Sequence, residues 1–233
     1  MKWHWIAFGC GLMAMAGIAS AESGGRVKLD KMALDRTEVT IGQFRRFIAD
    51  SRLETAAERD GGGHEFAGGW TRRPGWTWST PFGEPAADDE PAVHVSWSEA
   101  RDYCSAIGGR LPTLEEWARA AYTETRADPT DDFATGRTYP YPVGDSPDGM
   151  NTSGMDRWPR HAAVGTTRRG INGLYDMGGN VWEWLADRRG DEALTAGGSW
   201  WYGSDKTQSS AVQWKPAGFY AVYIGFRCAY GSR

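Results

Sequence analysis

Three helix-start signals constrain this chain more than any other feature of its sequence. Each is a capping box, in which a hydroxyl residue is followed three positions later by Gln or Glu, so that both side chains satisfy free backbone N–H groups. The three boxes are Thr40 with Gln43, Ser96 with Glu99, and Thr113 with Glu116. Apolar residues follow each box at helical spacing. We therefore expect three short amphipathic helices, each beginning in the first half of the chain.

The rest of the sequence predicts short strands separated by long loops. The chain of 233 residues contains 31 glycines and 13 tryptophans, which indicates many turns and a core built from a few bulky side chains. Short extended segments are expected at residues 32–40, 92–95, 193–196 and 222–228. Loops are expected at residues 57–91, 123–172 and 201–220, and loops of such length usually carry function or bind an ion.

The first 21 residues have the features of a signal peptide. Lys2 precedes an apolar stretch at residues 6–18, which is too short to span a bilayer, and residues 19–21 (Ala-Ser-Ala) fit a signal-peptidase site. We therefore divide the chain into a signal peptide, residues 1–21, and one mature domain, residues 22–233. The expected location is periplasmic or secreted, without a stable membrane anchor. A formal net charge of −4 argues against nucleic acid as a partner.

Two cysteines remain after residue 21, and they form an even pair. In an oxidising compartment such a pair favours one disulfide. Cys104 falls on the apolar face of the helix predicted after Ser96, and Cys228 lies near the end of the chain. The alternative for each is a buried free thiol.

Six segments, taken in order, resemble the formylglycine-generating enzyme (sulfatase-modifying factor) domain family. They are DRTEVTIGQFRRFI (35–48), PAVHVSWSEARDYC (91–104), GGRLPTLEEWARAA (108–121), NGLYDMGGNVWEW (172–184), GGSW (197–200) and IGFRCA (224–229). The resemblance covers nearly the whole mature chain. It implies an α+β fold related to C-type lectins, loop-rich with little regular secondary structure. It also pairs the cysteine of the second segment, Cys104, with that of the last, Cys228.

The resemblance further implies a structural calcium ion. Carried over by position, its ligands are the side chains of Asp176 and Glu183 and the backbone oxygens of Gly179 and Val181. Carboxylates and backbone carbonyls are the oxygen ligands that calcium prefers. The alternative is that Glu183 caps a helix or pairs with an arginine. A second family calcium site would begin at residues 151–152, but its downstream aspartate has no match here.

The copper chemistry of the family has no counterpart in this sequence. The family's reaction oxidises a substrate cysteine to formylglycine, using oxygen and a copper ion held by two cysteines, and soft thiolates suit Cu(I). Counting from residues 197–200, the corresponding positions hold Tyr202 and Thr207, which are not soft ligands. We therefore expect neither copper nor the family's catalytic residues. The mature histidines, at positions 64, 94 and 161, show no metal-binding spacing.

Polar and aromatic residues occupy the positions of the family's cleft. The candidate binding residues are Trp182, Ser199, Trp201, Tyr202, Thr207, Trp214 and Tyr223. Rigid aromatic side chains with short polar neighbours form binding surfaces at small entropic cost. Trp182 and Trp200 are expected in the core, whereas Trp201, Tyr202 and Trp214 are expected to be exposed. The implied partner is a peptide, a glycan or a periplasmic protein.

Two functions of different classes follow from these residues, and the sequence leaves open whether the protein is an enzyme. The favoured hypothesis is an exported binding or accessory (maturation) protein without copper–cysteine oxidase chemistry. The alternative is a divergent oxidoreductase of the same family, acting in the maturation of a periplasmic protein or a siderophore. A third, weaker hypothesis treats residues 201–223 as a variable recognition face.

Overall fold

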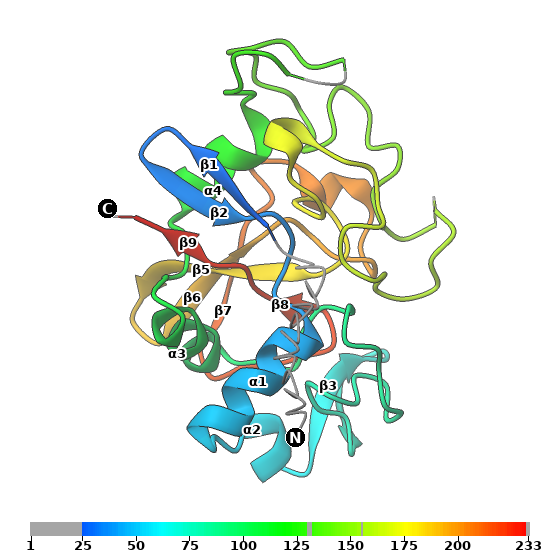
Figure 1. The fold of residues 1–233 in the computed structure, drawn as a ribbon. Coiled ribbons are helices and arrows are strands. Elements are labelled where there is room, and N and C mark those ends of the chain that lie inside the picture. The colour runs from blue at the N-terminus through cyan, green and yellow to red at the C-terminus, as the bar shows by residue number, and fades with distance from the viewer. Residues whose placement is uncertain (1–24, 130–131, 155, 232–233) are drawn as a thin grey trace, which may run out of the picture.

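The computed structural model describes residues 25–129, 132–154 and 156–231 (Figure 1). The predicted signal peptide, residues 1–21, lies outside the described residues. The three predicted helices are confirmed, each beginning at its capping box: α1 (Ile41–Ser51), α3 (Trp97–Ala106) and α4 (Leu114–Tyr122). A further short helix, α2 (Ala56–Arg59), begins at the capping box of Thr55 and Glu58. No helix in the described ranges has the length and apolar character needed to cross a membrane.

Three small sheets organise the strands. The largest has the order β7-β6-β5-β8 and is formed by β5 (Trp182–Arg189), β6 (Glu192–Ala196), β7 (Gln213–Pro216) and β8 (Ile224–Gly225). In it, β5 is parallel to β8, and the other pairs are antiparallel. A second sheet contains β1 (Arg26–Leu29), β2 (Met32–Asp35) and β9 (Ala229–Tyr230), and a hairpin contains β3 (Gly62–Phe66) and β4 (Trp70–Pro74). Two 3₁₀ turns are η1 (Ile171–Gly173) and η2 (Ser204–Thr207).

Some predicted strands and loops require correction. The strand predicted at residues 193–196 is confirmed as β6, whereas that at 32–40 ends at Asp35. The strand predicted at 92–95 is wrong: the segment is fully buried, but His94 has φ +56°, a left-handed conformation that interrupts an extended chain. The predicted loops at 57–91 and 201–220 are also wrong in part, because they contain the β3–β4 hairpin and β7.

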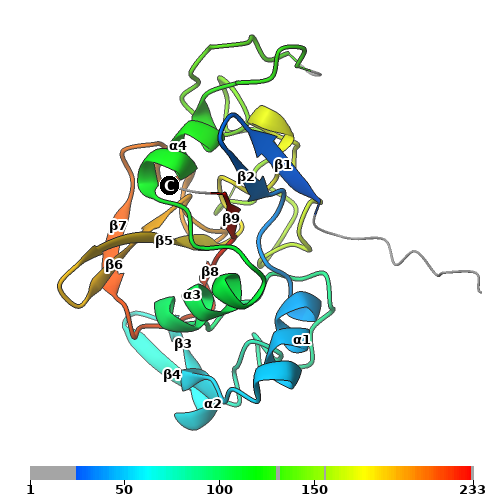
Figure 2. The same ribbon diagram turned by 60° about the vertical axis from the view of Figure 1, so that its left-hand side comes forward.

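The two largest clusters of the core lie one on each face of the large sheet, and a third, small cluster contains Phe133, Tyr139 and Ile171. Figure 2 shows α1 and α3 below β5, β6 and β7, with α4 and the β1–β2 hairpin above them. Successive side chains of a strand point to opposite faces, so Trp184 of β5 packs with the cluster that includes Phe44 of α1, whereas Leu185 packs with Trp117 of α4. The sheet is therefore covered on both sides.

The disulfide favoured by the sequence is present. Cys104 of α3 is bonded to Cys228, with 5.5 Å between their Cα atoms, and both residues are fully buried. The bond joins α3 to the segment that connects β8 and β9. The alternative of two buried free thiols is therefore wrong.

Candidate functional site

The segment that follows β6 forms one side of the candidate site. The chain changes direction there at two glycines. Gly197 and Gly198 have φ values of +95° and +73°, and a Cβ atom on Gly198 would lie 3.0 Å from the backbone oxygen of Lys206. Only glycine accommodates both the conformation and the close approach. Beyond the turn, the backbone N–H of Trp200 donates to the oxygen of Asn180 (2.9 Å), which holds the segment against the start of β5.

The structure brings four of the seven predicted binding residues together. The rings of Trp182 and Tyr202 lie 5.7 Å apart, those of Tyr202 and Tyr223 lie 6.4 Å apart, and those of Trp201 and Tyr223 lie 5.7 Å apart. Trp182 and Tyr223 are buried, Tyr202 is partly exposed, and Trp201 is 45% exposed. The four residues thus form a layered group, in which buried rings support exposed ones.

The other three predicted residues have different surroundings. Ser199 is fully buried beside this group, and its hydroxyl has no hydrogen-bond partner among the described residues. The hydroxyl of Thr207, also buried, donates to the backbone oxygen of Ser204 (2.8 Å). Trp214, expected to be exposed, is partly buried and packs against the core cluster on the opposite face of the sheet, where the guanidinium of Arg189 lies 4.6 Å from its ring centroid. Trp214 is therefore apart from the group around Tyr223.

The β3–β4 hairpin extends the exposed aromatic area, and sequence reasoning missed it. Phe66 and Trp70, 41% and 49% exposed, lie on opposite strands of the hairpin, with their ring centroids 5.6 Å apart. Trp70 also contacts Phe219 (4.7 Å) and Tyr223 (6.2 Å). The hydroxyl of Tyr223 accepts a hydrogen bond from the backbone N–H of Phe66 (3.1 Å). The available signal was two short runs separated by adjacent glycines, the pattern of a hairpin.

We call this area the aromatic surface. It comprises Phe66, Trp70, Trp201, Tyr202 and Phe219, which lie around the buried Tyr223.

A lysine that the sequence did not single out lies at the buried edge of this group. The Nζ atom of Lys215, on β7, is 4.9 Å from the ring centroid of Trp182 and donates to Oε1 of Gln213 (2.6 Å). Burial lowers the pKa of Lys215 to about 8, because the charged ammonium loses hydration. No carboxylate among the described residues forms an ion pair with it.

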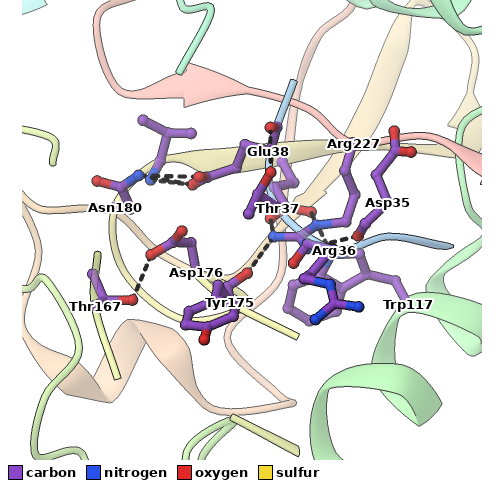
Figure 3. A network of polar contacts seen from close by, with 12 residues as sticks. Asp35, Arg36, Thr37, Glu38, Trp117, Thr167, Tyr175, Asp176, Asn180 and Arg227 are labelled. Carbon is purple, nitrogen blue, oxygen red and sulfur yellow. Dashed lines mark hydrogen bonds and ion pairs between the residues drawn. The ribbon is translucent and has the colours of Figure 1, made fainter. Parts of the chain in front are cut away.

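The predicted calcium segment contains a buried ion pair. Both oxygens of Glu183 accept from the guanidinium of Arg227 (2.7 and 2.8 Å), and one also accepts from the indole N–H of Trp117 (2.7 Å). Figure 3 shows how the Arg227 side chain also reaches the backbone oxygens of Asp35 and Tyr175 (3.1 and 2.8 Å). Of the alternatives that the sequence left open, the structure therefore contains the pairing of Glu183 with an arginine.

The carboxylate of Asp176, the other predicted side-chain ligand, also accepts hydrogen bonds from groups of the protein. One oxygen accepts from the hydroxyl of Thr167 (2.5 Å; Figure 3). The other accepts from the backbone N–H of Gly165 (2.7 Å). Burial raises the pKa of Asp176 and, together with the nearby charges of Asp176 and Glu183, raises the pKa of Glu38. Within the described ranges, no group of three or more His, Cys, Asp or Glu side chains is arranged to hold a metal ion. The carboxylates of Asp176 and Glu183 are thus engaged with protein donors in this structure. Calcium binding at this segment stays a prediction.

Solved structures define the class of fold. PvdO from Pseudomonas aeruginosa superimposes with a TM-score of 0.63 at 18% identity, covering 86% of this chain and 80% of that one. Treponema denticola variable protein 1 gives a TM-score of 0.61 at 17% identity, covering 86% and 84% of the two chains. The protein therefore has the α+β, loop-rich, C-type-lectin-like fold that the sequence predicts.

The family follows from the sequence as a whole. Residues 6–231 match the sulfatase-modifying factor enzyme 1-like domain, and the chain belongs to this family.

Relatives within the family carry different names. A formylglycine-generating enzyme from Thermomonospora curvata is 28% identical over 218 residues, which cover 82% of this chain and 68% of that protein. An inactive C-alpha-formylglycine-generating enzyme 2 from Bos taurus is 27% identical over 248 residues, covering 88% and 79%. A hercynine oxygenase from Mycolicibacterium thermoresistibile is 29% identical over 239 residues, and the chain spans 52% of that protein's length. Family membership alone therefore does not assign an activity.

Proposed function

We propose that this member of the family is an exported binding or accessory (maturation) protein that holds a peptide, a glycan or a protein partner on its aromatic surface. It acts without the copper–cysteine chemistry of the formylglycine-generating enzymes.

The observation that carries this proposal is the clustering of exposed apolar side chains. Among the described residues, four large hydrophobic side chains are exposed: Phe66, Trp70, Ile107 and Trp201. Three of the four belong to the aromatic surface: Phe66 and Trp70 come from the β3–β4 hairpin, and Trp201 comes from a segment far from it in the chain. Contiguous exposed apolar patches mark interaction sites in soluble proteins, and tryptophan is enriched among residues that dominate binding energy.

The positions of the family's copper-binding cysteines support the second half of the proposal. Tyr202 and Thr207 stand at those positions, and neither side chain is a soft metal ligand. The two cysteines of the predicted mature domain, Cys104 and Cys228, are bonded to each other. Neither is near position 202 or 207 in the sequence. The bovine protein above, which is 27% identical to this chain, is named as inactive.

Binding is tested with the mature protein, residues 22–233, labelled and applied to peptide and glycan arrays. We expect a reproducible ligand class, and we expect the double variant Trp70→Ala/Trp201→Ala to raise the Kd at least about tenfold, since truncation of a central tryptophan costs more than about 1 kcal/mol. The matched control is Ile107→Ala, which removes an exposed apolar side chain outside the aromatic surface. The absence of any ligand, or an equal loss in the control, contradicts the proposal.

The absence of oxidase chemistry is tested separately. The mature protein is incubated with oxygen, copper and a cysteine-containing peptide substrate of the formylglycine-generating enzymes, and the peptide is examined by mass spectrometry. We expect unchanged cysteine. Formation of formylglycine would refute this part of the proposal without affecting the binding test.

The divergent oxidoreductase remains the second candidate, and the hercynine oxygenase relatives favour it. Metal analysis of the purified mature protein separates the two functions. Stoichiometric copper or iron supports an oxidoreductase, whereas neither metal at stoichiometric level supports the binding protein.

A further inference from the structure

A pocket of about 620 Å³ lies between the helices α1 and α3 and the small sheet of β1, β2 and β9. Its volume falls within the range of about 300–1,000 Å³ that is typical of small-molecule sites. No residue that lines this pocket belongs to the aromatic surface. The pocket is therefore a second candidate site, independent of the proposed binding function.

Four charged side chains line the pocket, two of each sign. Arg26 of β1 and Asp35 of β2 are paired in register on adjacent strands, a placement that allows a cross-strand ion pair. Arg46 and Asp50 lie one turn apart on α1, a spacing that allows an ion pair on a helix. Neither of these two pairs occurs among the ion pairs that the described residues form.

The charged groups face other partners or solvent instead. The guanidinium of Arg26 packs over the ring of Tyr230, 3.4 Å from its centroid. A guanidinium that is stacked in this way keeps its N–H edge available for a planar carboxylate. The carboxylate of Asp35 accepts a hydrogen bond from the backbone N–H of Cys228 (3.0 Å), whereas Arg46 and Asp50 are exposed. Opposite charges therefore surround the pocket without neutralising one another in pairs.

The pocket also has an apolar side. Phe47 of α1 packs edge-on against Tyr103 of α3, with 5.4 Å between the ring centroids. Ala106 and Ile107, at the end of α3, line the same pocket, and Ile107 is 40% exposed. A ligand that satisfies this lining has charges of both signs and an apolar portion.

We propose that this pocket binds a small zwitterion with an apolar side chain, namely an apolar α-amino acid or a short peptide of such residues. The two arginines recognise the carboxylate of the ligand, the two aspartates recognise its ammonium group, and its side chain lies against the apolar side of the pocket. A ligand with a single charge would leave one pair of side chains uncompensated, so the balance of two cations and two anions favours a zwitterion.

The probes are L-phenylalanine and L-phenylalanyl-L-phenylalanine, titrated into the mature protein by isothermal calorimetry. Two analogues keep the aromatic ring but carry one charge: 3-phenylpropanoate lacks the ammonium group, and phenethylamine lacks the carboxylate. We expect saturable binding of at least one zwitterion. Each single-charge analogue should bind at least about tenfold more weakly, as the loss of one charge-assisted hydrogen bond implies. The tighter of the two zwitterions distinguishes a free amino acid from a peptide.

Two variants test the charged residues of α1. Arg46→Gln and Asp50→Asn should each raise the Kd of the bound zwitterion at least about tenfold. Both side chains are exposed, and an unchanged circular dichroism spectrum verifies that each variant is folded. The matched control is Arg45→Gln, on the same helix but outside the pocket, where the guanidinium pairs with Asp88 (3.0 Å). This control should leave the Kd unchanged.

No saturable binding of either zwitterion up to about 10 mM overturns the proposal. Equal binding of a single-charge analogue, or undiminished binding by Arg46→Gln or Asp50→Asn, overturns it as well. The double variant Trp70→Ala/Trp201→Ala separates this site from the aromatic surface, because it should leave the binding of the zwitterion unchanged. Loss of that binding in the double variant would place the probe on the aromatic surface and refute the assignment of the pocket.

Discussion

Removal of the disulfide is the perturbation whose magnitude follows most directly from the structure. Cys104 and Cys228 are separated by 124 positions, so the bond closes more than half of the chain into one loop. In the chain-entropy model, opening a loop of this length stabilises the unfolded state by about 5 kcal/mol, and the loss of a native disulfide usually costs about 2–5 kcal/mol. For a domain of this size, the lower value already corresponds to a decrease in Tm of at least about 4 °C.

The assay is urea unfolding of the mature protein and of Cys104→Ala/Cys228→Ala, followed by tryptophan fluorescence. We expect the free energy of unfolding to fall by about 2–5 kcal/mol in the variant. A reductant should destabilise the wild-type protein and leave the variant unchanged, because only the wild type has a bond to reduce. A loss below about 1 kcal/mol, or two free thiols in the unreduced wild type after denaturation, would refute the reasoning.

Three further predictions concern buried titratable residues. Glu183→Gln leaves the charge of Arg227 buried without its partner, so we expect a loss of about 3 kcal/mol or more in urea unfolding; Asp88→Asn, which breaks an exposed ion pair with Arg45, should cost less than about 1 kcal/mol, and equal losses would contradict this. Burial lowers the pKa of His94 to about 3, whereas the unfolded histidine binds a proton below about pH 6.5. His94 alone should therefore decrease stability by about 1.4 kcal/mol per pH unit as the pH falls from about 6 to 4. Its imidazole resonance should stay at the neutral position over that range, and a titration midpoint near 6.5 would show the reasoning to be wrong. Finally, if calcium binds at residues 176–183, calorimetry on chelator-treated protein should give binding that Asp176→Asn weakens at least about tenfold and the exposed control Asp145→Asn does not; no heat and no thermal shift at millimolar calcium would remove the calcium prediction.

The predicted helices were correct because their signals are local. A capping box needs only two side chains three residues apart, and the structure contains all three predicted boxes. The box at Thr55 and Glu58 was missed because α2 is only four residues long and no apolar run at helical spacing follows it. A capping box therefore predicted a helix only where an apolar run at helical spacing followed it.

The strand prediction at residues 92–95 failed because a buried segment was interpreted as an extended one. Residues 92–95 are all buried, but their backbone hydrogen bonds go to separate segments: the N–H of Ala92 donates to the oxygen of Val39, and that of His94 donates to the oxygen of Ala221. The same uncertainty concealed the β3–β4 hairpin within a predicted loop. Strand pairing depends on distant partners, so composition alone does not decide it.

The sequence by itself determined the helix starts, the family and the favoured pairing of Cys104 with Cys228, because each depends on neighbouring residues or on ordered motifs. The tertiary structure decided which side chains meet. It placed Trp70 beside Tyr223, Lys215 over Trp182, and Trp214 on the other face of the sheet. These contacts join segments distant in the chain, and they depend on the folding of loops around a sheet rather than on any local pattern.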